Sequence, residues 1–208
     1  MKYDIHARIV WSFLKKDFKN ELEVYYNNKT TKDILKKAKK NYKKIILRSP
    51  YIGGIKNPFT TNILTGAMVV SIYKAGDGMI KSQDVGNMLT NIFEKSSKIK
   101  IYIKIKSKNY FTHEWQIKRN QLSKKSRIRK YKSNFVSEFI YGPSVNEYGV
   151  NFYECGICKL FSQEKVTELI PYMCKLDFII SNYMGAYLQR TKTLANGDGV
   201  CNFWYLKK

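Results

Sequence analysis

A cysteine and an aspartate lie three residues apart in the C-terminal part of the chain. Cys174 and Asp177 stand at positions i and i+3 of a helix that Pro171 is predicted to open, so the thiol and the carboxylate share one face. In the first turn of that helix, the dipole and the free N–H groups would favour a thiolate, which is a nucleophile at neutral pH. The alternative is a buried structural cysteine, with Asp177 paired to a lysine.

An arginine follows on a predicted strand, in the sequence RTKT at residues 190–193. Arg190 would lie on one face of this strand and Thr193 on the other. Arg190 could bind a substrate carboxylate through two parallel hydrogen bonds, or it could pair with Asp177 or Asp198 as a structural tie. The sequence leaves both alternatives open.

All four cysteines lie in this part of the chain, which favours thiols, reactive groups or metal ligands over a disulfide framework in an intracellular protein. Cys155 and Cys158 form a CxxC pair, and with Cys174 and Cys201 they could offer four thiolates to zinc. A structural zinc site usually has two close ligand pairs, whereas the second pair here is widely separated. The sequence HEWQI at 113–117 lacks the second histidine of a zinc-protease motif, and no phosphate-binding or dinucleotide-binding glycine pattern occurs. We therefore expect neither a metal nor a cofactor.

The length and composition fit a single domain over residues 1–208. Hydrophobic residues make up 44% of the chain and aromatic residues 14%, which suffices for a well-filled core and argues against global disorder. The first residues carry charges at every turn, unlike a signal peptide, and no apolar stretch approaches the roughly 20 residues of a membrane-spanning helix. We therefore expect a cytoplasmic protein without a membrane partner, and the sequence leaves open whether it forms a homo-oligomer.

The net charge of +22 would attract polyanions, but the lysines that produce it are spread along the whole chain among many Ile, Asn and Tyr residues. This distribution favours a solvated lysine surface over a nucleic-acid interface. Nucleic acid is therefore not an expected partner, and the densest basic run, residues 118–132 (KRNQLSKKSRIRKYK), is the one place where an anion-binding patch could lie.

Periodic apolar residues predict a mainly helical part over residues 1–130. The predicted helices span residues 4–26, with Ile5, Ile9, Phe13, Phe18 and Leu22 as apolar positions, 31–47 with Thr31 as its cap, 60–74, 82–95 and about 110–130. Residues 98–106 (KIKIYIKIK) alternate strictly between isoleucine or tyrosine and lysine, and this pattern alone predicts a strand. The segment stands between predicted helices, so the sequence leaves open whether it is a strand or a helix.

The period changes in the strand-rich part, residues 131–208. Residues 134–141 and 150–155 alternate as strands, residues 162–165 resemble a helix start, and Pro171 opens a helix over 172–184. Residues 187–194 and 200–205 then predict a hairpin around the turn sequence NGDG at 196–199. Helices followed by an antiparallel strand-rich segment indicate an α+β fold, with the candidate site in the second part.

Three motifs of this part, taken together, resemble the L-2-amino-thiazoline-4-carboxylic acid hydrolase family. They are YECGIC at 153–158, Cys174-x-x-Asp177, and RTKTLANGDGVCNF at 190–203. The resemblance implies an α+β fold and hydrolytic opening of a cyclic, amidine-like ring. The chain departs from the family pattern at Asn202, where an aspartate is expected, and at Trp204, where a basic residue is expected. The residues at the family's motif positions are Cys155, Cys174, Asp177, Arg190, Thr193, Asp198 and Cys201.

These observations predict a hydrolase that acts on a C–N bond of a small-molecule substrate. The expected catalytic residues are Cys174, Asp177 and Cys201. The expected substrate-binding residues are Arg190, Thr193, Asp198 and Cys155. One alternative is a non-catalytic small-molecule-binding or sensor domain that uses the same residues. A further alternative is a basic nucleic-acid-associated protein that acts through residues 118–132.

Overall fold

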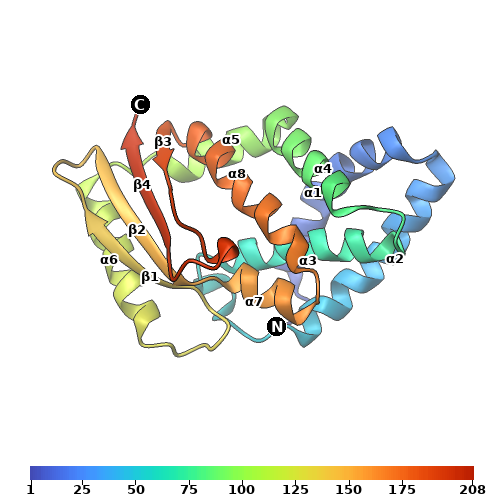
Figure 1. Cartoon of the computed structure of the whole chain (residues 1–208), viewed down its shortest axis with the longest axis horizontal. Helices are drawn as coiled ribbons and strands as arrows, with labels where there is room; N and C mark the ends of the chain where they lie inside the picture. Colours follow the sequence, from blue (N-terminus) through green and yellow to red (C-terminus); the bar gives the residue numbers. More distant parts are fainter. The chain divides into compact units, whose positions relative to one another are not determined.

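The computed structural model describes all 208 residues and has the predicted α+β fold. Eight α-helices accompany one four-stranded antiparallel sheet (Figure 1). The chain divides into two compact units, Met1–Ile92 with Ile157–Met173 and Phe93–Gly156 with Cys174–Lys208. The expectation of a single domain over residues 1–208 stays a prediction, and each unit is described by itself. None of the helices combines the length and the apolar character that a transmembrane span requires.

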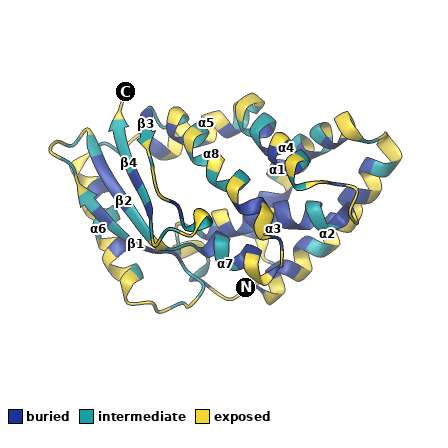
Figure 2. Ribbon diagram, in the orientation of Figure 1, coloured by how far each residue is buried: buried dark blue, intermediate teal, exposed yellow.

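The first unit is built around α3 (Thr60–Ala75), which is buried along most of its length (Figure 2). The helices α1 (Ile5–Tyr25) and α2 (Asn28–Arg48) pack on it, and most of α4 (Ser82–Lys95) and α7 (Gly156–Gln163) belong to the same unit. An almost continuously apolar helix is stabilised by contacts on every side, which explains the central place of α3. The predicted helices at 60–74 and 82–95 are confirmed, whereas α2 is capped by Asn27 and not by Thr31.

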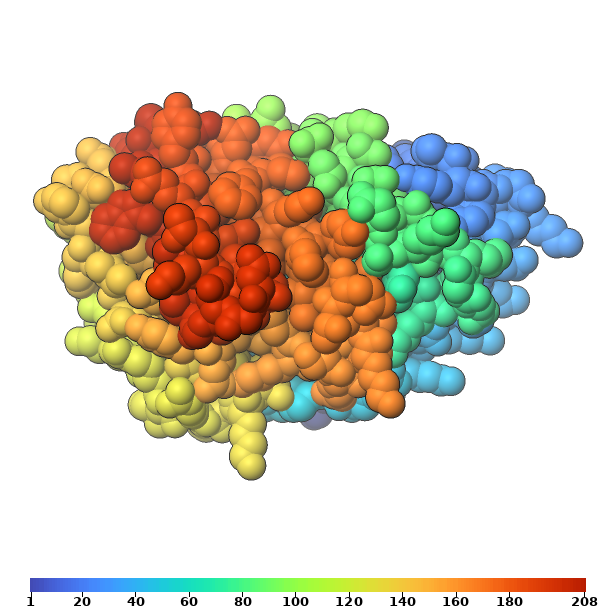
Figure 3. Space-filling view, in the orientation of Figure 1, coloured from blue at the N-terminus to red at the C-terminus, as the bar shows by residue number.

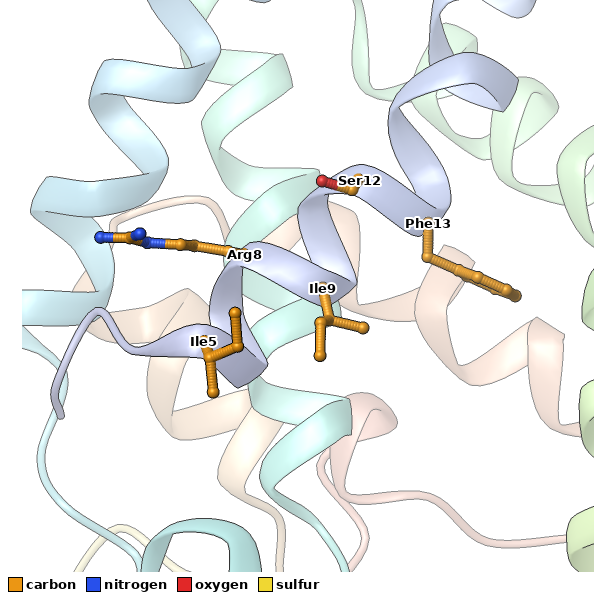
Figure 4. A pocket seen from close by; sticks show the side chains of 5 residues that line it. All are labelled: Ile5, Arg8, Ile9, Ser12 and Phe13. Atoms are coloured by element: carbon orange, nitrogen blue, oxygen red, sulfur yellow. The ribbon is translucent and has the colours of Figure 1, made fainter.

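The predicted apolar stripe of α1 is wrong at its N-terminal end. Ile5 and Ile9 are 69% and 57% exposed, and the core side of the helix instead buries Trp11 and other residues of a neighbouring face. Ile5, Arg8, Ile9, Ser12 and Phe13 line an open surface hollow of about 430 Å³ (Figure 4). Two apolar faces compete in this sequence, and the one that carries the larger aromatic ring, Trp11, gains more by burial.

The segment at 162–165 ends a helix and does not begin one. The helix α7 stops at Gln163, and Lys165 turns the chain with a left-handed φ of 57°. Between them, Glu164 accepts hydrogen bonds from Arg48 Nε at 2.6 Å and from Lys74 Nζ at 2.7 Å, with its side chain only 1% exposed. Burial by itself would raise the pKa of Glu164, but the two cations hold that pKa below its usual value.

Residues 98–106, which the sequence left open between strand and helix, form a helix, although their alternation by itself favours a strand. The helix α5 (Ser97–Ser107) buries Ile99 and Ser107 on one side, and it leaves Ile101 and Ile105 57% and 64% exposed. Period-two alternation stabilises a strand only when a neighbouring strand completes the hydrogen bonds, and α5 has no place in the sheet. The helix α6 (His113–Arg127) follows, capped by the Thr112 hydroxyl.

The sheet of this unit has the strand order β1-β2-β4-β3. Its strands are β1 (Val136–Tyr141), β2 (Glu147–Glu154), β3 (Ala186–Gln189) and β4 (Cys201–Lys207). The register pairs Tyr148 with Tyr205 and Val150 with Phe203, so these four side chains lie on one face of the sheet, which we call the inner face. The helix α6 packs on the inner face through Trp115, whose ring centroid lies 5.3 Å from that of Tyr148.

The two strands of the predicted hairpin at 187–205 pair with each other, but the connection between them is much longer than a two-residue turn. The strand β3 ends at Gln189, so Arg190 and Thr193 lie in an irregular connection, residues 190–200, and not on a strand. A short 3₁₀ turn (Leu194–Asn196) shapes it, and Gly197 adopts a left-handed φ of 87° that favours glycine. The glycine-rich sequence therefore turns the chain as predicted, but it does so inside a longer loop.

Candidate active site

The centre of the candidate site is an ion pair between α8 (Ile170–Tyr183) and the connection that follows β3. Arg190 Nη1 donates to Asp177 Oδ2 at 2.5 Å, and Arg190 Nη2 donates to the backbone oxygen of Cys174 at 3.0 Å. The Arg190 side chain is only 6% exposed, whereas that of Asp177 is 34% exposed. Of the two roles that the sequence left open for Arg190, this structure contains the pairing with Asp177.

Two aromatic rings hold the Arg190 guanidinium in place. Its central carbon lies 4.9 Å from the ring centroid of Phe178 and 5.0 Å from that of Phe203. Cation–π contacts of this kind are favourable by about 0.5–1 kcal/mol each at exposed sites and by more when they are desolvated. The arginine is therefore fixed by packing as well as by its hydrogen bonds, and Asp177 is fixed with it.

The pKa of Asp177 is raised to about 6, because burial disfavours its charge more strongly than the Arg190 guanidinium and its hydrogen bond favour it. The group therefore titrates near neutral pH, while about one third of its side-chain surface is open to solvent. A carboxylate with these properties can accept and return a proton at physiological pH.

Of the two states that the sequence left open for Cys174, a thiolate and a buried thiol, the structure favours the buried thiol. The helix α8 starts at Ile170, so Cys174 lies beyond its first turn, where the helix dipole has little effect. Burial first, and then the charge of Asp177 and the proximity of Cys155, raise the pKa of Cys174 to about 12, although Arg190 opposes them. At rest this thiol is protonated.

Cys201 and Cys155 lie close enough to this pair to affect the same titrations. Cys201 is 7% exposed on the inner face of β4, and its Sγ accepts a hydrogen bond from the Leu194 N–H at 3.1 Å. Burial raises the pKa of Cys201, and the Leu194 N–H opposes that shift by favouring negative charge on sulfur. The structure therefore brings together Cys155, Cys174, Asp177, Arg190 and Cys201.

Thr193 and Asp198 form hydrogen bonds within the connection of residues 190–200. The Asp198 carboxylate accepts from the Thr193 N–H at 2.7 Å, and the Thr193 hydroxyl accepts from the Asn196 N–H at 3.2 Å. These bonds close the loop that lies at the surface, where residues 190–200 are coloured red in Figure 3. Both residues shape the loop that presents Arg190 and Leu194, and their predicted contact with a substrate stays a prediction.

The comparisons with known proteins agree with these motifs. The family model described as L-2-amino-thiazoline-4-carboxylic acid hydrolase matches residues 61–205, which is well over half of the chain. The chain belongs to this family. No curated protein and no solved structure matches it. All seven site residues predicted from the family motifs lie within the matched region.

The two departures from the family pattern lie on the sheet face opposite to Cys201. The side chains of β4 alternate, so Cys201 and Phe203 face inward while Asn202 and Trp204 face outward. The Asn202 amide oxygen accepts from the backbone N–H groups of Thr191 and Lys192, at 3.1 and 2.6 Å. An aspartate at position 202 could accept the same two bonds, so the asparagine leaves the hydrogen-bonded attachment of the connection to β4 intact.

Trp204 is held against the outer face of the sheet. Its Nε1 donates to Glu147 at 3.3 Å, and its ring lies directly over Gly149, where an added Cβ would come within 2.7 Å of ring atoms. The tryptophan therefore packs on the sheet away from the thiols of this family member.

Sequence reasoning did not single out Tyr148 and Tyr205 on the inner face of the sheet, or Arg119 on α6, which packs on that face. The charges of Asp177 and Arg190 both affect the hydroxyl of Tyr205, whose pKa burial raises well above the usual tyrosine value. Alternation along β4 from Cys201 to Phe203 to Tyr205 could have indicated the tyrosine. Nothing in the sequence of the basic run at 118–132 distinguishes Arg119 from its neighbours. In the structure Arg119 is less exposed than the other basic residues of the run, and burial lowers its pKa.

The same basic run is only partly available to an anionic partner. Lys118 pairs with Glu114 at 2.6 Å, Arg127 with Glu138 at 3.4 Å, and Arg129 with Glu154 at 2.7 Å. With Arg119 turned inward, the run lacks the continuous stripe of free cations that a nucleic-acid interface usually presents. The structure also contains no group of three or more His, Cys, Asp or Glu side chains arranged to hold a metal ion.

Proposed function

We propose that this protein is a hydrolase that opens a small cyclic amidine or amide by cleaving a C–N bond. The observation that carries the proposal is the carboxylate of Asp177, which Arg190 holds beside Cys174 and whose pKa of about 6 suits proton transfer. Membership of the L-2-amino-thiazoline-4-carboxylic acid hydrolase family supports the same reaction class. The third of the Asp177 side chain that is exposed gives a substrate access to this group.

In the proposed reaction, Asp177 accepts the thiol proton while the sulfur of Cys174 adds to the carbon of the amidine. The proton then passes from Asp177 to the departing ring nitrogen as the C–N bond breaks. Water adds to the resulting thioester-like intermediate, Asp177 accepts one of its protons, and the thiol of Cys174 is restored as the product leaves. Because the resting thiols are protonated, the reaction depends on proton transfer to Asp177 as the bond to sulfur forms.

Cys201 is the second candidate for the attacking sulfur. Its Sγ already accepts the Leu194 N–H, which would stabilise negative charge on sulfur or on an adjacent substrate atom. Arg190 is proposed to fix Asp177 and to contribute positive charge to the bound substrate. The further substrate contacts are assigned to Thr193, Asp198 and Cys155.

The test is to incubate the purified protein with L-2-amino-thiazoline-4-carboxylic acid and to follow the gain of one water by mass spectrometry. Asp177→Asn is expected to lower kcat at least about a hundredfold, since general acid–base catalysis contributes roughly that much. Of Cys174→Ser and Cys201→Ser, the variant that loses turnover identifies the nucleophile. Cys158→Ser, which changes a thiol outside the predicted site, serves as the matched control. Unchanged kcat in Asp177→Asn would refute the role of this carboxylate.

A non-catalytic binding domain is the second candidate, and the raised pKa of both thiols favours it. A protonated, largely buried cysteine is chemically inert and often structural. The same experiment separates the two functions, because a binding domain would retain the ligand and yield no product over many protein equivalents.

A further inference from the structure

The connection that carries Arg190 is attached to β4 by Asn202. The Asn202 amide oxygen accepts hydrogen bonds from the backbone N–H groups of Thr191 and Lys192, at 3.1 and 2.6 Å. The amide nitrogen donates to the Thr191 hydroxyl at 2.9 Å, and the Asn202 backbone N–H donates to the Lys192 backbone oxygen at 3.3 Å. Residue 202 therefore holds two consecutive residues of the connection, mainly through its side chain, and we call these bonds the Asn202 attachment.

The Asn202 attachment begins where the regular pairing of β3 with β4 ends. The last register pair of these two strands joins Gln189 to Trp204. Arg190 therefore follows a residue held in the sheet and precedes two residues held by Asn202. Because consecutive Cα atoms lie a fixed distance of about 3.8 Å apart, a residue whose neighbours are held on both sides has little freedom of its own. The attachment thus fixes the point from which the Arg190 side chain extends.

This point matters because Arg190 reaches across to α8. Its guanidinium donates to the Asp177 carboxylate at 2.5 Å and to the Cys174 backbone oxygen at 3.0 Å. The rings of Phe178 and Phe203 contact the guanidinium and limit how far it can swing. A charge-assisted hydrogen bond needs a donor–acceptor distance of about 2.7–2.9 Å, so a displacement of the Arg190 backbone by about 1 Å is enough to weaken it strongly.

Asn202 does not itself belong to the groups that face Asp177. The side chains of β4 alternate, so Asn202 lies on the outer face of the sheet, whereas Cys201 lies on the inner face. The charged and titratable groups around the Asp177 carboxylate come from α8, from the connection and from β4, and they are Cys174, Arg190, Cys201 and Tyr205. An effect of Asn202 on Asp177 therefore passes through the connection and Arg190.

We propose that Asn202 is a positioning residue of the candidate active site, which holds Arg190 against Asp177 during proton transfer. This inference rests on the proposed function, in which Asp177 transfers the protons. An amide suits the role, because it offers both an acceptor and a donor and carries no charge. The attachment therefore keeps the same hydrogen bonds over the pH range in which Asp177 titrates.

The test is to follow the ionisation of Asp177 by NMR spectroscopy of its carboxyl carbon in the wild type and in Asn202→Leu, with the signal assigned through Asp177→Asn. Leucine has a similar shape and forms none of the side-chain bonds, while water can reach the freed N–H groups of Thr191 and Lys192 because both residues are exposed. The pKa of Asp177 should rise from about 6 by about one pH unit, since an adjacent arginine lowers a carboxyl pKa by about 1–3. The acidic limb of the pH profile of kcat should move by the same amount.

Two further variants separate positioning from a merely structural role. Asn202→Asp keeps both accepted hydrogen bonds, so Asp177 should titrate in it as in the wild type. Asn151→Leu changes the asparagine directly opposite Asn202 on β2, on the same outer face, and is the matched control that should leave the titration unchanged.

Equal pKa values of Asp177 in the wild type and in Asn202→Leu would overturn the inference, even if the melting temperature of the variant fell. An Asn202→Asp variant that titrates like the leucine variant would overturn it as well. A wild-type protein that turns over no cyclic amidine or amide would refute the proposed hydrolysis, whereas the NMR titration would still decide whether Asn202 holds Arg190 against Asp177.

Discussion

Replacing Arg190 with methionine should destabilise the fold in a strongly pH-dependent way. Breaking a buried ion pair by removing one partner costs about 3–5 kcal/mol, and the partial exposure of Asp177 places this pair at the lower end, about 3 kcal/mol. Loss of the contacts with Phe178 and Phe203 adds about 1 kcal/mol. Methionine retains much of the apolar stem, so we expect a decrease of about 4 kcal/mol in the free energy of unfolding at about pH 7.5.

The pH dependence follows from the raised pKa of Asp177. The pKa of Asp177 is about 6 in the folded protein and 3.8 for a solvent-exposed aspartate, as in the unfolded chain. The free energy of unfolding of the wild type therefore decreases as the pH rises from 3.8 to about 6, because the unfolded chain loses the Asp177 proton before the folded protein does. Without Arg190 the pKa increases beyond 6, so the unpaired carboxyl is neutral at about pH 5 and costs little there. The difference between wild type and variant should therefore shrink to about 1–2 kcal/mol at acidic pH.

Urea-induced unfolding, followed by circular dichroism at acidic and mildly alkaline pH, measures this difference. Lys192→Met is the matched control, since it removes an exposed cation from the same connection and should change stability by less than about 0.5 kcal/mol. A destabilisation by Arg190→Met that is equal at both pH values, or that matches the control, would refute the coupling between Arg190 and the charge of Asp177.

Three further outcomes are expected. The reaction of Cys174 with a thiol reagent is measured in a variant in which the other three cysteines are replaced by serine. Because the pKa of Cys174 is raised to about 12, the rate should increase about tenfold per pH unit well beyond pH 9. A rate that reaches a plateau near neutral pH would contradict this. Glu164→Gln should lower the free energy of unfolding by about 3 kcal/mol at neutral pH and by less as the pH falls through the lowered pKa of Glu164, as measured by urea unfolding. Gly149→Ala should displace the ring of Trp204, shift its fluorescence and cost about 1–3 kcal/mol, and an unchanged spectrum would argue against the close contact.

The sequence by itself determined the fold class, the family and the positions of most helices. The helix at 82–95 could be predicted from its clear apolar period, and the helix at 60–74 from a nearly continuous apolar run that ends at the glycine-rich turn of residues 76–78. The family motifs are short and contiguous, so they suggested Cys174, Asp177 and Arg190 as candidates without any knowledge of packing. Where two structures fit one pattern, as in α5, the absence of a pairing strand decided the outcome, and this is not a local property.

Only the tertiary structure decided what the site residues do electrostatically. Burial raises the pKa of Asp177 while Arg190 opposes that shift, and burial together with the charge of Asp177 keeps Cys174 protonated. These effects depend in part on neighbours distant in sequence. The same holds for Arg119, which is one basic residue among many in the sequence and is partly shielded from solvent, beside Phe152, only when α6 packs on the sheet. Residue types and their spacing indicate where chemistry can occur, but desolvation and long-range contacts determine the protonation states on which that chemistry depends.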